Sequence, residues 1–298
     1  MENQLLTGKQ FNSIYGNQTF VKLTNIYENH NGYQFQTGSN VDSIPFCPNG
    51  NCQPGGIYFC LMEKMHFWLN YGGQDMFYKR LVTIPDDAQI WVEKDKFKAN
   101  KLILSERHRI HSLEIWKDVE YCLLAVRHNG LTLQYIKRQS KEICLSAVRQ
   151  SGWALRYVVR QTPEICSAAV QQTSHALQFV KEQTTKICLE AIQQDGWTLK
   201  YVEQQTPEIC IVAVKQDGWA LKSVGHQTQE ICLIAVQQNG HALQYVLEQS
   251  DDICLAAVKQ DGRALQFVKQ QTLNICQQAV QKNTCALKYV EERFQKFV

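Results

Sequence analysis

Apolar residues between residues 118 and 293 recur with a fixed period of 22 residues. Each period opens on a side chain that can cap a helix N-terminus. Apolar residues then follow at positions i, i+1, i+4 and i+5, which predicts one buried stripe on a short helix. In one copy this stripe is Ile165, Cys166, Ala169 and Val170. The eight copies begin at Asp118, Ser140, Thr162, Thr184, Thr206, Thr228, Ser250 and Thr272.

A second apolar group in each period predicts a second short helix. In one copy this group is Ala154, Leu155, Tyr157 and Val158. A polar residue followed by glycine separates the two groups, as at Asp217-Gly218, and we expect the glycine to end the first helix in a left-handed conformation. Helices this short do not persist alone in water, so neighbouring repeats must stabilise one another.

The repeats therefore predict an all-α solenoid of eight 22-residue helix-turn-helix repeats over residues 118–293. Residues 106–117 are expected to form a linking helix that caps the first repeat, and residues 294–298 form a tail. Residues 1–105 carry a different pattern, which predicts a small α+β domain. Alternating apolar and β-branched residues predict strands at residues 19–27, 33–36, 57–59, 78–84, 89–92 and 101–104.

Three further features of the N-terminal domain can be predicted. The Asn31-Gly32 pair predicts a tight turn between its first two strands. Residues 62–70 are expected to form a helix, and the Gly- and Pro-rich residues 47–56 an irregular loop.

Eight of the twelve cysteines occupy the same position of successive repeats, which marks a structural role. Stacked helices lie roughly 8–10 Å apart, whereas a disulfide needs Cα atoms within about 7 Å, so these cysteines are not expected to pair along the stack. They are expected to be small buried apolar residues in a reducing compartment. The eight are Cys122, Cys144, Cys166, Cys188, Cys210, Cys232, Cys254 and Cys276.

Composition restricts the partners. The chain is 44 % apolar and 20 % charged. Its net charge of +3 is too small to produce a strong electrostatic field that would attract nucleic acid or an anionic membrane. Some helical repeats bind RNA one base per repeat, but acidic first turns recur here, and we do not expect nucleic acid to bind. No secretory signal opens the chain, and its apolar runs are too short to span a bilayer.

Two glutamines recur in phase with the repeat, one before each cap and one near the end of each first helix. Gln205 and Gln216 are examples. Their amides could satisfy backbone groups of loops or coat a solvated face, or they could form a ladder that binds an extended ligand. We favour the structural interpretation.

One column of the repeat varies, directly after the turn glycine. It holds Leu131, Trp153, His175, Trp197, Trp219, His241, Arg263 and Cys285. A core position would keep one size and polarity, whereas aromatic residues and arginine carry the energy of many interfaces. We therefore predict an interaction ridge of Trp153, His175, Trp197, Trp219, His241 and Arg263. In the alternative, the tryptophans cover the next repeat while histidine and arginine point to water.

Cys47, Cys52, Cys60 and His66 are a candidate zinc set. Their spacings of five, eight and six residues fit no common zinc finger, and Cys60 follows a strand, where it can be part of the core. We therefore expect no metal and no cofactor.

His30-Asn31-Gly32 and Gly56-Ile57-Tyr58-Phe59 resemble the histidine-x-glycine and glycine-x-tyrosine-phenylalanine elements of ADP-ribosyltransferases. The resemblance implies that His30 and Tyr58 would hold a nicotinamide dinucleotide. The glutamate that such enzymes use would be Glu93 or Glu106, neither of which has a distinctive context. An ADP-ribosyltransferase-like domain acting on a target recruited by the repeats is thus an alternative function.

The N-terminal elements Pro48-Asn49-Gly50, Gly55-Gly56-Ile57-Tyr58-Phe59 and Ile84-Pro85-Asp86-Asp87-Ala88 resemble a module of giant amoeba-virus (mimivirus-type) proteins. The Ile-Cys-x-x-Ala-Val and Ala-Leu-x-Tyr-Val repeats resemble a short helical-repeat family of the same viruses. This resemblance implies a viral protein made in host cytoplasm, with no catalytic residues to transfer. We expect a non-enzymatic scaffold whose repeats bind a host or viral protein.

Overall fold

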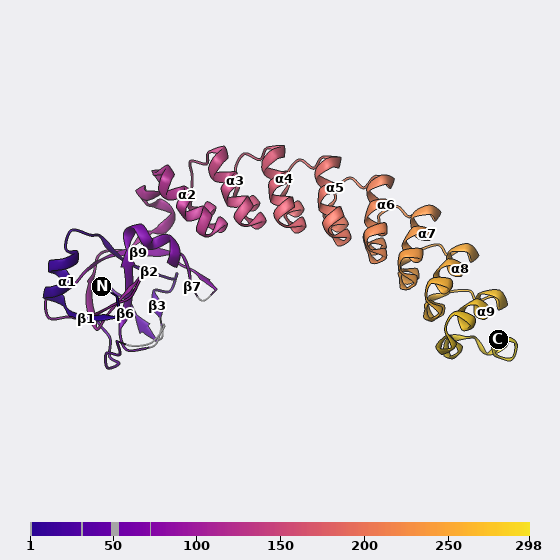
Figure 1. The fold of residues 1–298 in the computed structure, drawn as a ribbon, viewed down its shortest axis with the longest axis horizontal. Coiled ribbons are helices and arrows are strands. Elements are labelled where there is room, and N and C mark those ends of the chain that lie inside the picture. The colour runs from indigo at the N-terminus through magenta and orange to yellow at the C-terminus, as the bar shows by residue number, and fades with distance from the viewer. Residues whose placement is uncertain (1, 31, 49–53, 72) are drawn as a thin grey trace. The chain divides into compact units, whose positions relative to one another are not determined.

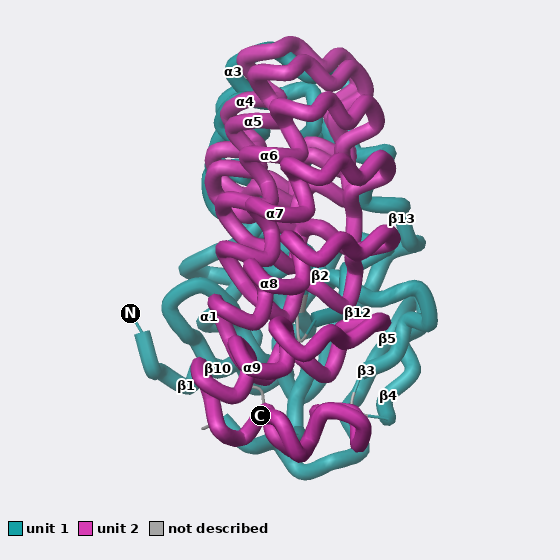
Figure 2. Tube along the Cα trace, turned by 90° about the vertical axis from the view of Figure 1, so that its right-hand side faces the viewer, with its two compact units in different colours: residues 1–150 teal, residues 151–298 magenta. Residues whose placement is uncertain are grey.

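The computed structural model describes residues 2–30, 32–48, 54–71 and 73–298 (Figure 1). The chain divides into two compact units, residues 1–150 and residues 151–298 (Figure 2). Unit 1 contains a sheet domain, a connecting segment, the first repeat and the first helix of the second repeat. Unit 2 contains the remaining repeats. The boundaries predicted at residues 105 and 117 stay predictions.

The N-terminal domain is built on a nine-stranded antiparallel sheet in the order β1-β10-β11-β6-β2-β9-β12-β5, with β13 also paired to β9. Two further hairpins, β3-β4 and β7-β8, stand apart from it. The strands are β1 (Gln4–Thr7), β2 (Phe20–Thr24), β3 (Asn29–His30), β4 (Tyr33–Gln34), β5 (Gly38–Val41), β6 (Ile57–Leu61), β7 (Asn70–Tyr71), β8 (Gln74–Asp75), β9 (Tyr78–Thr83), β10 (Gln89–Val92), β11 (Phe97–Ala99), β12 (Lys101–Leu104) and β13 (His108–Arg109).

The core of this domain is aromatic. Phe11, on helix α1 (Gly8–Tyr15), is fully buried, and its ring packs 5.0 Å from Phe20, 6.0 Å from Phe59 and 5.3 Å from Phe97. Thr7 and Gln10 form a capping box that fixes the start of α1. The strand pattern predicted the sheet, but it did not predict α1, which covers it.

Two helices expected in unit 1 take a different form in the structure. Residues 62–70 do not form an α-helix: a 3-10 helix, η1 (Met62–Trp68), occupies this segment, and Asn70 already belongs to β7. The expected linking helix at residues 106–117 is replaced by β13 and two single turns, η2 (Ile110–Ser112) and η3 (Glu114–Lys117). His108 and Arg109 extend the edge of β9, and this pairing removes them from any helix. The tight turn predicted at Asn31-Gly32 begins outside the described residues, at Asn31.

The eight predicted repeats are confirmed, each as an α-helix followed by a 3-10 helix. The α-helices are α2 (Val119–His128), α3 (Lys141–Gln150), α4 (Pro163–Gln172), α5 (Thr185–Gln194), α6 (Pro207–Gln216), α7 (Gln229–Gln238), α8 (Asp251–Gln260) and α9 (Leu273–Lys282). The 3-10 helices are η4 (Gly130–Tyr135), η5 (Gly152–Tyr157), η6 (Ser174–Phe179), η7 (Gly196–Tyr201), η8 (Gly218–Ser223), η9 (Gly240–Tyr245), η10 (Gly262–Phe267) and η11 (Thr284–Tyr289). A last 3-10 helix, η12 (Glu292–Phe297), follows, and its Phe297 carbonyl accepts a hydrogen bond from Gln277 of α9.

The expected caps are in place: the hydroxyl of Thr206, for example, accepts a hydrogen bond from the backbone N–H of Ile209. The second element of each repeat is tighter than predicted. Its backbone hydrogen bonds join residues three positions apart: the Ala220 N–H donates to the Asp217 carbonyl, and the Val224 N–H donates to the Leu221 carbonyl. The six residues therefore form a 3-10 helix instead of an α-helix.

The turn glycine has a different role from the predicted one. Asp217, in extended conformation with φ −148°, ends α6, and Gly218 is the first residue of η8. The positive-φ glycines of the described chain all lie in the sheet domain, so the expected left-handed glycine of the repeats is wrong. A Cβ atom at Gly218 would lie 2.5 Å from the carbonyl oxygen of Ala235 in the next repeat. At Gly218 a side chain would therefore force the two repeats to shift, although the equivalent position of an earlier repeat accommodates Ser174.

Glutamine and cysteine join successive repeats, which confirms the structural interpretation of both columns. In unit 2 the amide of Gln205 donates to the carbonyl of Ser223 at 2.8 Å and accepts from the N–H of Gly225 at 2.9 Å. The Cys210 thiol donates to the same amide oxygen at 3.8 Å. The second glutamine column does similar work, since the Gly218 N–H donates to Gln238 at 2.7 Å. The eight repeat cysteines are buried free thiols.

Candidate functional site

The interaction ridge, defined as Trp153, His175, Trp197, Trp219, His241 and Arg263, occupies one structural position in unit 2. Each residue is the second of its 3-10 helix, η5 to η10. The side chain two residues before the ridge residue fixes this position where it is aspartate or asparagine. Asp195 accepts a hydrogen bond from the Trp197 N–H at 2.9 Å, and Asp217 accepts one from the Trp219 N–H at 2.9 Å. The local sequence thus sets the direction in which each ridge side chain leaves the backbone.

Most ridge side chains pack edge-on against an aromatic ring of the next repeat. The ring centroids of Trp153 and Phe179 lie 5.7 Å apart at 67°, and those of Trp219 and Tyr245 lie 5.6 Å apart at 65°. His175 and His241 make the same contact with Tyr201 and Phe267. Yet Trp153 remains 42 % exposed. Each of these side chains therefore combines the two alternatives given above. One edge of the ring covers the neighbouring repeat, and the rest faces solvent.

Trp197 lacks this ring neighbour. The position that holds Phe179, Tyr201 and Tyr245 in other repeats of unit 2 holds Ser223 in the repeat after Trp197. The aromatic side chain that other repeats place here, which typically buries about 150–250 Å², is thus absent beside Trp197, and we name this ring-free position the notch.

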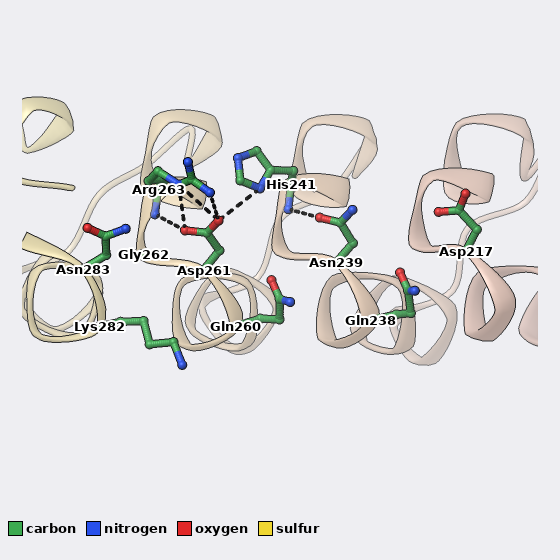
Figure 3. Close-up of a pocket in the computed structure, with 10 residues that line it drawn as sticks. All are labelled: Asp217, Gln238, Asn239, His241, Gln260, Asp261, Gly262, Arg263, Lys282 and Asn283. Atoms are coloured by element: carbon green, nitrogen blue, oxygen red, sulfur yellow. Dashed lines mark hydrogen bonds and ion pairs between the residues drawn. The ribbon is translucent and has the colours of Figure 1, made fainter. Parts of the chain in front are cut away.

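Charged groups accompany the ridge toward its C-terminal end. Asp261 accepts from the Arg263 guanidinium at 2.9 Å, and its carboxylate also lies 3.6 Å from Nδ1 of His241 (Figure 3). The hydrogen bond from Arg263 outweighs burial and holds the pKa of Asp261 below its usual range. His175 and Asp195 make a similar contact at 3.8 Å. The part of the ridge from His241 to Arg263 is therefore ionic and the part from Trp197 to Trp219 is aromatic, with the His175–Asp195 contact on the N-terminal side of both.

A polar hollow of ≈ 550 Å³ adjoins the ionic part (Figure 3). Its lining residues come from four successive repeats, among them Asp217, Gln238, Asn239, Gln260 and Lys282. Sequence reasoning missed this hollow because it took the residues before each glycine only as helix stops. The signal was available, since those positions hold Asp195, Asp217, Asn239 and Asp261 in register.

The two residues of the alternative nucleotide site line one hollow of ≈ 820 Å³ in the sheet domain. His30 and Tyr58 are both among its lining residues, although 28 positions separate them in the chain. Burial, together with the charge of Lys22, lowers the pKa of His30. Neither Glu93 nor Glu106 is among the described lining residues. The structure therefore brings together the first two residues of the transferase-like set without the third.

The candidate zinc set is incomplete in the described chain. Cys52 lies outside the described residues. Cys60 is buried, which raises the pKa of its thiol to about 12, and the ring of His66 packs 5.5 Å from that of Tyr121. Within residues 2–30, 32–48, 54–71 and 73–298, no three His, Cys, Asp or Glu side chains are grouped so that they could hold a metal ion. Over the same residues, no helix has both the length and the apolar character to cross a bilayer.

The fold and the ridge together define the class: a helical-repeat protein with an N-terminal β-sheet domain. More narrowly, the chain belongs to the family described as Domain of unknown function (DUF4116). The family model matches residues 118–158, 140–184, 185–229, 206–249, 228–273 and 251–295, which together span more than half of the chain.

Similar proteins of a giant virus confirm the expected relationship to mimivirus-type repeat proteins. The chain is 30 % identical over 116 residues to uncharacterized protein R869 of Acanthamoeba polyphaga mimivirus, which covers 37 % of this chain and 81 % of that protein. It is also 30 % identical over 105 residues to putative ankyrin repeat protein R868 of the same virus, over 33 % of this chain and half of that relative's length. No solved structure matches the chain.

Proposed function

We propose that the protein is a non-enzymatic interaction scaffold whose repeats bind a host or viral protein through the ridge. The observation that carries this proposal is the contrast between columns. The glutamine and cysteine columns are nearly invariant and join one repeat to the next, whereas the ridge column varies and is only partly buried. Stacking on the next repeat does not hold the ridge column to one residue type, so the exposed part of each ridge side chain is available for recognition.

The notch between Trp197 and Ser223 is the proposed anchor point. Tryptophan is enriched among the residues that dominate binding energy, and such residues act best when they line a pocket that a partner side chain fills. A partner segment with an apolar side chain would occupy the place that Tyr201 or Tyr245 fills in other repeats. The contacts of Trp153, His175, Trp219 and His241 with their own ring neighbours would orient the rest of the ridge.

Affinity capture tests this proposal. The full-length chain is immobilised, and amoebal lysate, from infected and uninfected cells, is passed over it. We expect Ser223→Tyr to abolish capture of the specific partner, because the new ring fills the notch while restoring the residue type of the other repeats. Ser223→Ala keeps the notch open and should retain capture, so it is the matched control.

A second variant tests the ridge by removing two of its rings instead of filling the notch. Trp197→Ala combined with Trp219→Ala should also lose the partner, whereas Gln204→Ala, an exposed position outside the ridge, should not. Retained capture by both Ser223→Tyr and the double tryptophan variant would refute the proposed binding surface. Capture by an N-terminal fragment alone would not support the proposal either, because it would place the binding surface outside the repeats.

A further inference from the structure

The hollow in the sheet domain arises where two paired strands separate. β2 pairs with β6 at Phe20↔Leu61 and Val21↔Cys60. Beyond that point β2 follows β9, and β6 turns to β11, with Phe59 opposite Phe97. The gap is lined by Lys22 and Thr24 from β2 and by Tyr58 from β6. At ≈ 820 Å³ its volume is within the range of about 300–1,000 Å³ that small-molecule sites occupy.

Two lysine side chains lie in the wall of this hollow over aromatic rings. Lys22 is only 7 % exposed, and its ammonium lies 4.6 Å from the ring centre of Phe35. Lys96 lies 4.6 Å from the ring of Tyr58 and 5.3 Å from that of Trp68, and it also pairs with Glu93 at 3.3 Å. The ammonium groups of Lys22 and Lys96 bring positive charge to this wall, so charge-assisted hydrogen bonds would stabilise an anionic group beside them.

The charge of the other lining groups is small. Asp75 is the one carboxylate among the described lining residues, and it accepts a hydrogen bond from the Asn70 amide at 2.8 Å. His30 favours its neutral form, because burial and the nearby Lys22 lower its pKa. The hollow as lined by the described residues therefore suits an anion better than a cation.

Two further groups indicate what else the ligand carries. Thr24 is 2 % exposed, and its hydroxyl has no hydrogen-bond partner within the described part of the chain, although buried hydroxyls are normally satisfied. Tyr27, which also lines the hollow, is 74 % exposed, so its ring face is open to stacking. A polar group at Thr24 and a planar ring at Tyr27 would satisfy both.

We propose that this hollow binds a small organic anion that carries a planar ring, the class of which a mononucleotide is representative. The anionic group lies beside Lys22 and Lys96, a hydroxyl or carbonyl meets Thr24, and the ring stacks on Tyr27. This binding is independent of the ridge, so the scaffold function can hold whether or not the hollow binds a ligand.

Isothermal titration of the full-length chain with AMP tests the proposal, with adenosine and ribose 5-phosphate as the two part-ligands. AMP should bind, and each part-ligand should bind at least about tenfold more weakly, because each lacks one of the two recognised groups. No heat with AMP up to about 1 mM, or equal affinity for AMP and either part-ligand, would overturn the proposal.

Two variants locate the site. Lys22→Met keeps the apolar stem and should weaken AMP by about tenfold, and Tyr27→Ala should weaken it similarly by removing the stacking ring. Lys9→Met, on exposed α1, is the matched control and should leave the affinity unchanged. Because Tyr27 is exposed, its variant keeps the fold even where Lys22→Met does not. Unchanged AMP affinity in Tyr27→Ala, or an equal loss in Lys9→Met, would contradict the assignment.

Discussion

The sheet domain and the repeats satisfy their buried polar groups over very different distances along the chain. In the sheet domain, Glu28 pairs with Arg80, 52 residues away, at 2.8 Å and with Arg107, 79 residues away, at 2.9 Å. In unit 2, Gln205 reaches partners 18 and 20 residues ahead, and the other glutamines of its column repeat this pattern. A substitution in the Glu28 cluster should therefore lower the free energy of unfolding strongly, because no other cluster makes the same contacts. A substitution in one repeat removes only one of several equivalent contacts between repeats.

The largest effect is expected from removing one partner of the buried ion cluster. Arg80→Met leaves the carboxylate of Glu28, which is 6 % exposed, without its buried partner. Breaking a buried pair in this way costs about 3–5 kcal/mol. Chemical denaturation should show this loss in the free energy of unfolding, with Lys101→Met, at a partly exposed pair on β12, as the control. A loss below about 1 kcal/mol, typical of surface pairs, would contradict the contrast between the two regions.

The next effect concerns packing between repeats. Gly218→Ala places a Cβ atom 2.5 Å from the Ala235 carbonyl oxygen, so the two repeats must separate. Overpacking of this kind costs about 1–3 kcal/mol. At Gly225 the nearest atom to an added Cβ is Gln205 Oε1 at 3.6 Å, so Gly225→Ala should be neutral or slightly stabilising. Equal thermal stabilities of the two variants would show that close approach does not explain the turn glycine.

A smaller loss is expected from one glutamine joint. Gln205→Leu removes the amide that bonds the Ser223 carbonyl and the Gly225 N–H, at a cost of about 1–2 kcal/mol. The neighbouring Gln204 is exposed, so Gln204→Leu should change the unfolding free energy by less than about 0.5 kcal/mol. If both variants behaved alike, the glutamine column would not join the repeats.

Thr24→Val should act in the opposite direction. The Thr24 hydroxyl is buried without a hydrogen-bond partner in the described chain, so replacing it with a methyl group of similar shape removes an unsatisfied group. The gain should be about 1 kcal/mol, measured by denaturant unfolding of the ligand-free chain. A clear destabilisation would mean that the hydroxyl has a partner, and it would also weaken the case for a ligand at this position.

The smallest effect is a pH dependence of the ion cluster. Burial alone would raise the pKa of Glu28, but hydrogen bonds and charges from Arg80 and Arg107 outweigh it and hold the pKa below its ordinary value of about 4.3. A depressed pKa means that the carboxylate stabilises the fold above the ordinary value and that this contribution is lost as pH falls below it. The stability difference between the wild type and Glu28→Gln should therefore narrow from pH 7 to about pH 3. If the stability difference between the wild type and Glu28→Gln widened on acidification, the lowered pKa of Glu28 would be contradicted.

The separation along the chain between interacting residues also explains how much of the fold could be predicted from sequence. The helix caps, the buried Cys210 column and the ridge are local or repeat every 22 residues, so eight copies of one unit reveal them without an alignment. The role of Gly218 was predicted wrongly, because its constraint is a carbonyl in the next repeat and not its own backbone angle. The 3-10 form of the second element was also missed, since apolar spacing over six residues does not distinguish it from an α-helix.

The sheet domain was less predictable for a physical reason. Strands could be recognised singly, but the order that places β2 beside β6 joins residues about 40 positions apart, and no sequence pattern encodes that pairing. The hollow between these strands therefore appeared only in the structure, although His30 and Tyr58 had been singled out. Beside the ridge, Ser223 is the exception in a column of aromatic residues, and this signal in the sequence could have predicted the notch.

The most direct test of the ridge as the binding surface is site-specific photocrosslinking. A photoreactive phenylalanine analogue is introduced at position 219 of the ridge and, in a separate protein, at exposed position 208 near the start of α6. Each protein is incubated with amoebal lysate and irradiated. The account predicts a discrete crosslinked partner from position 219 that is lost when Ser223→Tyr is added, and none from position 208. Crosslinking from position 208 but not from position 219 would contradict it.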